Sequence, residues 1–150
     1  MAAQVVRISE PTPGLEMRIR RLLERTGTTR RWTDGGALFA VLGAGGEPLG
    51  VALAGEEERD GVIHLVAASP GGTGTGSALV NHLLQFLDGR CDRVFVVAGP
   101  AGPFFERFGF SPVAAGDLPA GVLEFDAVRD GLAAGCVPLV RELARRWQPD

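Results

Sequence analysis

The chain contains no tyrosine, and each of its 15 basic residues is an arginine, so lysine is absent as well. It has only two cysteines, Cys91 and Cys136, and neither stands near histidines or cysteines at metal-ligand spacing. We therefore expect reduced thiols and no metal site. No apolar run approaches the roughly 18 residues of a membrane helix, and no charged-then-apolar leader opens the sequence. These absences predict a cytoplasmic protein that does not contact a membrane.

Net charge and length limit the expected partners and the expected number of domains. The net charge is −3 and 45% of the residues are hydrophobic, so bulk charge gives no reason to expect a nucleic-acid partner. A chain of 150 residues is long enough to bury one substantial core. We expect residues 1–150 to form a single domain.

The most informative stretch is residues 61–87, where an apolar run, a glycine-rich loop and an amphipathic pattern follow one another. The apolar run at 62–67 predicts a buried strand, which ends by Pro70 because proline has no N–H to donate. Apolar residues then recur at helical spacing from Leu79 to Leu87. A glycine loop that opens a helix presents backbone N–H groups and the positive end of the helix dipole, which favour a phosphate. The alternative is a tight strand–helix connection without a ligand.

The spacing of the loop glycines argues against two common phosphate-binding loops. A P-loop ends in Gly-Lys-Ser/Thr, whereas Gly76 is followed directly by Ser77. The dinucleotide fingerprint G-x-G-x-x-G is not matched, and Asp92, the acidic residue at roughly the expected distance, stands before a strand and not at its end. A nucleotide-binding domain with an atypical loop stays open as an alternative.

Two motifs resemble the GNAT acyltransferase superfamily. Residues 71–76 resemble its pyrophosphate motif, Q/R-x-x-G-x-G/A, with Gly74 and Gly76 in the two small positions and a typical helix start, Gly-Ser-Ala-Leu-Val, at 76–80. Residues 104–110, Phe-Phe-Glu-Arg-Phe-Gly-Phe, resemble the family's later Phe-Tyr-Glu-Lys-x-Gly-Phe run. Two motifs in the right order and separation are more specific than one glycine loop.

The resemblance implies an α/β domain with a GNAT-like central mixed, largely antiparallel sheet flanked by helices, and acetyl-CoA as co-substrate. It also implies that the strand before the loop holds the pantetheine arm and polarises the thioester carbonyl through a backbone N–H group. The cofactor-binding residues expected on this basis are Val66, Ala67, Ala68, Gly71, Gly72, Thr73, Gly74, Thr75, Gly76, Ser77 and Phe105.

Three positions depart from the family pattern. Gly71 stands where Gln or Arg is usual, Ala98 where many members have Asn, and Phe105 where many have the Tyr that protonates the departing thiolate. Since the chain has no tyrosine, we expect a rate lower by ~10²–10⁴, although a coenzyme A thiol is acidic enough to leave as a thiolate with only water or N–H assistance. An aromatic–Phe pair at this place is similar to N-acetylglutamate synthase and to arsenic-resistance-associated acetyltransferases, which implies an amino-acid-like substrate.

Four residues are candidates for handling that substrate. His64 is a candidate general base because the ordinary pKa of histidine lies near neutrality, and a hydrogen-bonded core or surface histidine is the alternative. Glu124 is the second candidate base, against a solvated surface glutamate. Arg30 and Arg31 are candidates for binding a substrate carboxylate with their two-pronged guanidinium groups, against arginines that are only solvated.

The remaining patterns predict further elements: a strand at 4–9, a helix from Thr12 and Pro13 to Gly27, a hairpin of 37–42 and 48–54, a strand at 93–98, and a short helix from Pro103 to Gly109. Near-helical spacing predicts one helix over 118–132. Residues 136–143 read as a last strand, which Pro138 marks as an edge or bulged strand. Because an edge strand can pair with a second copy, a homodimer is one expectation.

Together these observations favour an N-acetyltransferase that moves an acetyl group from acetyl-CoA to a primary amine of a small, amino-acid-like molecule. Two other interpretations stay open. One is a catalytically weak acyl-CoA-binding regulatory module, which would explain the departures at Gly71, Ala98 and Phe105. The other is a variant acyl-CoA chemistry on the same scaffold.

Overall fold

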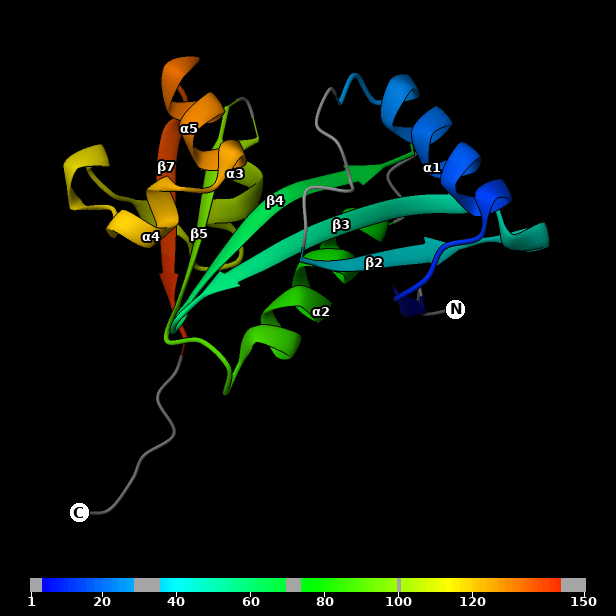
Figure 1. Ribbon diagram of the computed structural model, residues 1–150, viewed down its shortest axis with the longest axis horizontal. Coiled ribbons are helices and arrows are strands. Elements are labelled where there is room, and N and C mark those ends of the chain that lie inside the picture. The colour runs from blue at the N-terminus through cyan, green and yellow to red at the C-terminus, as the bar shows by residue number, and fades with distance from the viewer. Residues whose placement is uncertain (1–3, 29–35, 70–73, 100, 144–150) are drawn as a thin grey trace. The chain divides into compact units, whose positions relative to one another are not determined.

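The computed structural model describes residues 4–28, 36–69, 74–99 and 101–143. Within these ranges the strands form one seven-stranded sheet (Figure 1). The β4–β5 pair is parallel, whereas β1–β2, β2–β3, β5–β7 and β6–β7 are antiparallel, so the expected mixed, largely antiparallel sheet is confirmed. The strand order is β1 (Val5–Ile8), β2 (Ala37–Leu42), β3 (Pro48–Glu57), β4 (Asp60–Ala68), β5 (Arg93–Ala98), β7 (Val137–Glu142) and β6 (Ser111–Pro112).

The described helices are α1 (Pro13–Arg25), α2 (Thr75–Leu87), α3 (Gly102–Glu106), α4 (Ala120–Leu123) and α5 (Asp126–Ala133), with short 3-10 turns η1 (Ala44–Gly46) and η2 (Ala115–Asp117). Local signals account for α1. The side chain of Thr12 accepts a hydrogen bond from the N–H of Leu15 at 3.2 Å, and Pro13 takes the first helical position. Gly27, with a φ of 73°, follows the end of the helix. The predicted helix is confirmed.

Two compact units divide the chain. The N-terminal unit is Met1–Ala54 with Leu65–Leu83, and the C-terminal unit is Gly55–His64 with Leu84–Asp150. Both β4 and α2 contribute residues to each unit. The single domain expected from the length stays a prediction.

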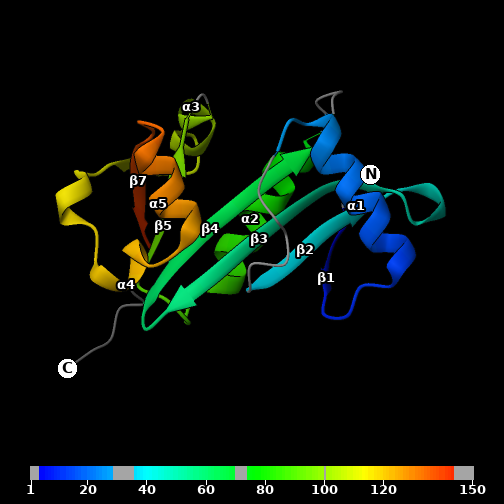
Figure 2. The same ribbon diagram turned by 45° about the horizontal axis from the view of Figure 1, so that its top comes forward.

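In the N-terminal unit, α1 and α2 cover opposite faces of the strands (Figure 2). On one face His82 of α2 packs against Phe39 of β2, with ring centroids 5.1 Å apart. Side chains alternate across a strand, so the neighbours of Phe39 face α1. The core on that side comprises Ile19, Leu22, Leu23, Leu38, Ala40, Val51, Leu53, Leu65 and Ala67.

In the C-terminal unit, α5 packs closely on β5. A Cβ atom at Gly131 would lie 2.5 Å from Cγ1 of Val97, so only glycine allows this approach without a shift. The core beneath α4 and α5 is apolar, and its buried members are Val62, Phe95, Leu118, Val122 and Val128.

The acidic run 56–60 covers the end of β3, the turn and the first residue of β4, and ion pairs neutralise part of it. The guanidinium of Arg90 donates to Glu56 at 2.7 Å. Farther along the run, Arg93 donates to Asp60 at 3.1 Å. Both carboxylates belong to the C-terminal unit, as do both arginines, so these pairs tie the turn to the chain around β5.

The single helix predicted over 118–132 is wrong. Leu118 precedes α4, Glu124 ends it, and Phe125 adopts an extended conformation with φ −73° and ψ 130° before α5 begins. The near-helical spacing misled because α4 and α5 both bury apolar residues in one core. An apolar period shows which side chains are buried but does not reveal one extended residue between two short helices.

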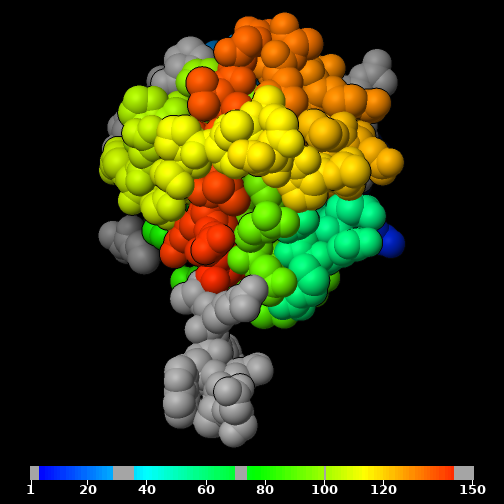
Figure 3. Space-filling model, turned by 90° about the vertical axis from the view of Figure 1, so that its left-hand side faces the viewer, coloured from blue at the N-terminus to red at the C-terminus, as the bar shows by residue number. Residues whose placement is uncertain are grey.

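The predicted edge position of the last strand is also wrong. β7 lies between β5 and β6, and its register with β5 runs without interruption from Val137 to Glu142. The carbonyl of Pro138 accepts a hydrogen bond from the N–H of Val113 at 3.0 Å, so the backbone of Pro138 faces away from β5. The N–H that proline lacks is therefore not needed in the β5–β7 ladder. Figure 3 shows the chain around β6 (yellow) lying across β7 (red).

Candidate active site

The N-terminus of α2 has the geometry of a phosphate-binding turn. Gly74 is exposed and has a φ of +80°, a conformation that glycine adopts without strain. The N–H of Ala78 donates to the carbonyl of Gly74 at 2.9 Å, which is the first hydrogen bond of the helix. The amides of Gly76 and Ser77 precede this bond and point out of the helix end, where the dipole is positive. Such an end favours an anion.

Part of the predicted site lies outside the described residues. This holds for Gly71, Gly72 and Thr73 of the glycine loop, and for the candidate substrate-binding residues Arg30 and Arg31. Their roles stay predictions.

The end of β4 directs two of its residues away from β3. The N–H of Ser69 donates to the carbonyl of Leu49 on β3 at 2.8 Å. Because backbone groups of successive strand residues point to opposite sides, the groups of Ala67 also face β3, whereas those of Val66 and Ala68 face the other way. In the described ranges the register between β4 and β5 ends at Ile63↔Val96, so it does not include these residues. Of the three predicted thioester-binding residues, Val66 and Ala68 thus have the suitable backbone direction.

His64 is half-buried and is held from two sides in the C-terminal unit. Its ring meets the edge of the Phe125 ring at 5.1 Å between centroids and an interplanar angle of 72°. A Cβ atom at Gly55 would lie 2.6 Å from Nε2 of His64, so the absence of a side chain at Gly55 makes room for the imidazole. The ring therefore has a defined position, and both of its nitrogens are buried. A general base also has to be within hydrogen-bond reach of the proton that it removes.

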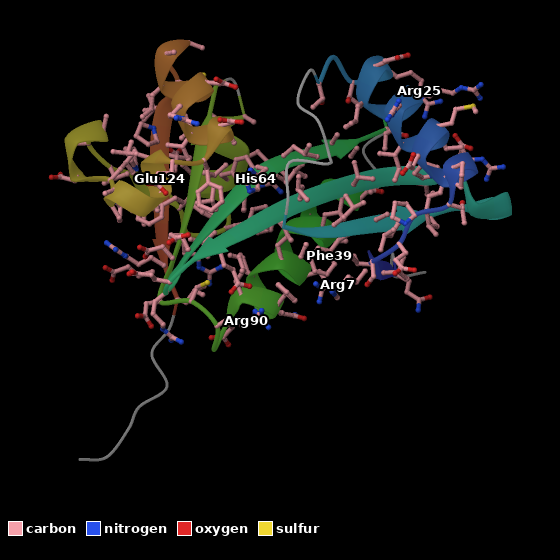
Figure 4. All side chains as sticks on the ribbon, in the orientation of Figure 1. Arg7, Arg25, Phe39, His64, Arg90 and Glu124 are labelled. Carbon is pink, nitrogen blue, oxygen red and sulfur yellow. The ribbon has the colours of Figure 1, made fainter. Side chains whose placement is uncertain are left out.

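Glu124 is exposed and stands at the end of α4. The next residue, Phe125, is the one that packs on His64, so the structure brings both candidate bases into one neighbourhood from different elements (Figure 4). The carboxylate of Glu124 has solvent around it and can exchange protons through water.

Phe105 is buried, and its ring packs against those of Phe104 and Phe110 at 5.2 and 5.7 Å between centroids. This side chain has no hydroxyl group, and the chain has no tyrosine that could supply one. Phe105, which the motif resemblance aligns with a general acid, is thus part of an aromatic cluster. Its expected contact with the cofactor stays a prediction.

Two surface cavities in the described part of the C-terminal unit lie away from His64. One, of about 740 Å³, is lined by charged residues that include Arg59, Asp92 and Glu142. The other, of about 520 Å³, is lined mainly by small and apolar residues, with Glu106 and Cys136 among them. Neither contains a predicted catalytic residue. Among the described residues no cluster of histidine, cysteine or acidic side chains could hold a metal ion, and no helix is long and apolar enough to cross a membrane.

Comparison with known families decides the wider question. The sequence profile described as "Acetyltransferase (GNAT) family" matches residues 7–110, more than half of the chain. The chain belongs to the GNAT acetyltransferase family. GNAT proteins are acyltransferases that use acetyl-CoA as co-substrate, so the expected family, enzyme class and acyl donor are confirmed at this level. A search of curated protein sequences gives no significant match.

Solved structures share the GNAT fold. N-acetylglutamate synthase from Neisseria gonorrhoeae, in complex with coenzyme A and N-acetyl-glutamate, matches 97% of this chain at a TM-score of 0.72 and 23% identity. A GNAT acetyltransferase from Staphylococcus aureus Mu50 matches 95% at 0.73 and 12% identity, over 100% of its own length. The ribosomal-protein-S18-alanine N-acetyltransferase from Escherichia coli matches 97% of both chains at 0.68 and 15%. This chain spans only 36% of the synthase. These likenesses confirm the fold class.

Sequence reasoning missed three residues that shape the site. Gly55 and Phe125 hold His64, and Gly50 makes close contacts with α2 that are described below. A glycine inside a strand pattern often marks a close approach of another backbone or side chain, so Gly50, within the predicted strand 48–54, carried a usable signal. Gly55 lay just beyond that predicted strand and carried none. Phe125 carried none, because its contact with His64 joins residues that are far apart in the sequence.

Proposed function

We propose that this protein is an N-acetyltransferase that transfers the acetyl group of acetyl-CoA to a primary amine of a small, amino-acid-like molecule. The observation that carries the proposal is the N-terminal turn of α2, where Gly74 adopts a positive φ and the amides of Gly76 and Ser77 point outward. Membership of the GNAT family supports a pyrophosphate as the anion that binds there. The amino-acid-like acceptor rests on the motif resemblance to N-acetylglutamate synthase alone.

The backbone of β4 takes the second role in the proposal. The outward N–H of Val66 or Ala68 donates to the thioester carbonyl oxygen and stabilises the negative charge that develops there during attack. Two neutral residues suffice, because backbone groups do this work. Holding the thioester next to the amine also removes a large entropic barrier.

Proton transfer is assigned to His64 or, through water, to Glu124. The amine nitrogen attacks the carbonyl carbon, the C–N bond forms, and the C–S bond breaks. The base removes the proton that the nitrogen must lose, and the sulfur leaves as a thiolate that water can protonate. No side-chain acid is needed at Phe105, which agrees with its burial among phenylalanines.

Calorimetric titration tests donor binding. We expect acetyl-CoA to bind with a dissociation constant in the range of about 1 µM to 1 mM and NADH and ATP to bind much more weakly. Gly74→Glu places a negative charge at the helix end and should weaken acetyl-CoA binding at least about tenfold. Gly74→Asn is the matched control, since asparagine tolerates positive φ and adds no charge. Equal binding of acetyl-CoA and ATP would contradict the proposal.

A pH–rate profile tests the base. We expect His64→Gln to lower kcat by ~10²–10⁴ and to remove the rise of activity with pH that deprotonation of the imidazole produces. The chain offers a matched control, because His82→Gln changes the other histidine, which packs on Phe39 of β2. An unchanged profile in His64→Gln, with a changed one in Glu124→Gln, would transfer the role to Glu124.

A regulatory acyl-CoA-binding module is the second candidate. The observation in its favour is the buried aromatic cluster of Phe104, Phe105 and Phe110, which replaces the family's acid. Such a module would bind acetyl-CoA but release no free thiol with any amine. A screen of amino acids and small amines with thiol detection separates the two functions, and turnover with any acceptor would exclude the module.

A further inference from the structure

Gly50 lies where three parts of the N-terminal unit meet. A Cβ atom at this position of β3 would lie 2.6 Å from Cγ2 of Thr75, 3.0 Å from Cδ1 of Leu79 and 3.1 Å from the carbonyl oxygen of Ala67. Thr75 and Leu79 belong to the first two turns of α2, and Ala67 is near the end of β4. All four residues are buried, so no solvent space is available to take up a displaced side chain.

The requirement for glycine at this position is spatial. Gly50 is not among the described glycines with positive φ, and it pairs with Val41 of β2 next to a register shift between Val41 and Leu42. Alanine could therefore adopt the same backbone conformation. It could not leave the Thr75 methyl group where it is, because two carbon atoms cannot approach to 2.6 Å. In these buried surroundings the Thr75 side chain, α2 or β3 would have to shift.

The elements in contact with Gly50 are those that carry the proposed donor-binding groups. Thr75 is followed by Gly76 and Ser77, whose amides face the phosphate position. Ala67 stands between Val66 and Ala68, whose backbone groups face the thioester position. The distance from β3 to the first turn of α2 therefore sets how far the phosphate-binding amides stand from the end of β4.

We propose that Gly50 is a positioning residue for acetyl-CoA: it lets the first turn of α2 approach the β3–β4 backbone closely enough for the turn to hold the pyrophosphate. This inference rests on the proposed function. A side chain at position 50 moves the amides of Gly76 and Ser77 away from the phosphate while the groups of Val66 and Ala68, which belong to the hydrogen-bonded strand, stay in place. The substitution should therefore weaken binding of the phosphate-bearing part of the donor.

Comparing two acyl donors, one with and one without phosphate, distinguishes this role from a general loss of stability. Acetyl-CoA carries the pyrophosphate, whereas S-acetylpantetheine has the same thioester and pantetheine arm without any phosphate. We expect Gly50→Ala to raise the KM for acetyl-CoA about fivefold to tenfold, with kcat little changed, and to leave kcat/KM for S-acetylpantetheine within about twofold. Calorimetry with coenzyme A should show the same loss of affinity without reliance on turnover.

The chain offers a matched control and a rescue. A Cβ at Gly61 of β4 would lie 3.1 Å from Cδ1 of Leu87, at the opposite end of α2, so Gly61→Ala disturbs the same helix far from its N-terminal turn. We expect Gly61→Ala to affect neither donor. Thr75→Ser removes the methyl group that Gly50→Ala would strike, and the double variant should recover most of the affinity for acetyl-CoA.

The outcomes are distinguishable. Selective loss of acetyl-CoA in Gly50→Ala, with recovery in the Thr75→Ser background, supports the inference. Equal loss of both donors, or wild-type affinity in a folded Gly50→Ala protein, overturns it while the proposed function stands. If wild-type protein binds neither coenzyme A nor acetyl-CoA, the proposed function fails and the inference fails with it.

Discussion

Cys91 and Cys136 differ in their surroundings although both are free thiols. Cys91 is buried at 2% exposure, whereas Cys136 is half-buried and lines a surface cavity. Burial, with a smaller contribution from the negative charge of Glu56, raises the pKa of the Cys91 thiol to about 11. Nucleophilic attack requires the thiolate, so Cys91 should be unreactive at neutral pH.

The first prediction concerns stability at high pH. The thiol of Cys91 ionises near its ordinary pKa of about 9 in the unfolded chain, but only near about 11 in the folded protein. Below pH ~9 the neutral thiol therefore contributes fully to the free energy of unfolding. As the pH rises toward ~11 this contribution is lost, and the free energy of unfolding falls by about 1–2 kcal/mol. Urea denaturation of the wild type at pH 8 and pH 10.5 measures the loss. Cys91→Ala should lack this component, and Cys136→Ala should retain it.

The second residue-scale prediction concerns Glu58 in the β3–β4 turn. Its φ of +56° is unusual for a residue with a side chain and places it in the left-handed region. Glu58→Asn or Glu58→Gly should raise the free energy of unfolding by roughly 0.5–1 kcal/mol, since both residues adopt this conformation more readily. Glu58→Val should lower it. If all three variants matched the wild type in a denaturant titration, strain at this position would be disproved.

Residue identity revealed only part of the site. Gly74 and Gly76 could be placed at a helix N-terminus because glycine spacing and the following apolar period are both local signals. Gly50, Gly55 and Phe125 act through contacts with residues distant in sequence, which spacing does not show. Val66 and Ala68 could be distinguished from Ala67 only when the hydrogen bond from Ser69 to Leu49 established which side of β4 faces β3.

At the scale of elements, the packing of α5 on β5 depends on the absence of a side chain at Gly131. A Cβ atom at Gly131 would meet Cγ1 of Val97 at 2.5 Å and Cβ of Val97 at 3.0 Å. Gly131→Ala should therefore lower the free energy of unfolding by about 1–3 kcal/mol, although alanine favours a helix.

In α1, Gly14 has no neighbour within 4 Å, and Gly14→Ala should stabilise the protein by up to about 1 kcal/mol.

The measurement for both glycines is chemical denaturation, and a second substitution tests the cause. Val97→Ala removes Cγ1, the atom that a Cβ at position 131 would approach to 2.5 Å, and leaves Cβ of residue 97 at 3.0 Å. In that background Gly131→Ala should be less harmful than in the wild type, which a double-mutant cycle would detect. Additive effects would show that the close contact between α5 and β5 does not cause the destabilisation by Gly131→Ala.

Elements with strong local signals were predictable, and those determined by tertiary contacts were not. Thr12 and Pro13 start α1, and β5 has the predicted bounds of 93–98, because capping and continuous apolar runs need no distant partner. The break at Phe125 depends on the core of the C-terminal unit. The inner position of β7 depends on the backbone hydrogen bond between Val113 and Pro138. Because β7 is not an edge strand, the expected homodimer loses its sequence argument and stays a prediction.

At the scale of the whole molecule, ligand binding tests whether the two compact units unfold together. Acetyl-CoA at about 100 times its dissociation constant should stabilise the native state by about 2.7 kcal/mol, or roughly 5–10 °C in Tm. If residues 1–150 form one cooperative domain, calorimetry should show a single transition that shifts as a whole. Two transitions, of which only one shifts, would contradict the single domain. Gly74→Glu, with an affinity at least about tenfold lower, should reduce the shift to about half or less at the same acetyl-CoA concentration.

Each of the two histidines lies against a phenylalanine ring: His82 against Phe39 in the N-terminal unit, and His64 against Phe125 in the C-terminal unit. Aromatic ring currents displace the magnetic resonances of nearby protons, so the native imidazole signals should differ from those of unfolded histidine. Proton NMR would then follow each unit through its own natural reporter, without an introduced label. Helix α2 and the candidate base would each be visible in the same spectrum.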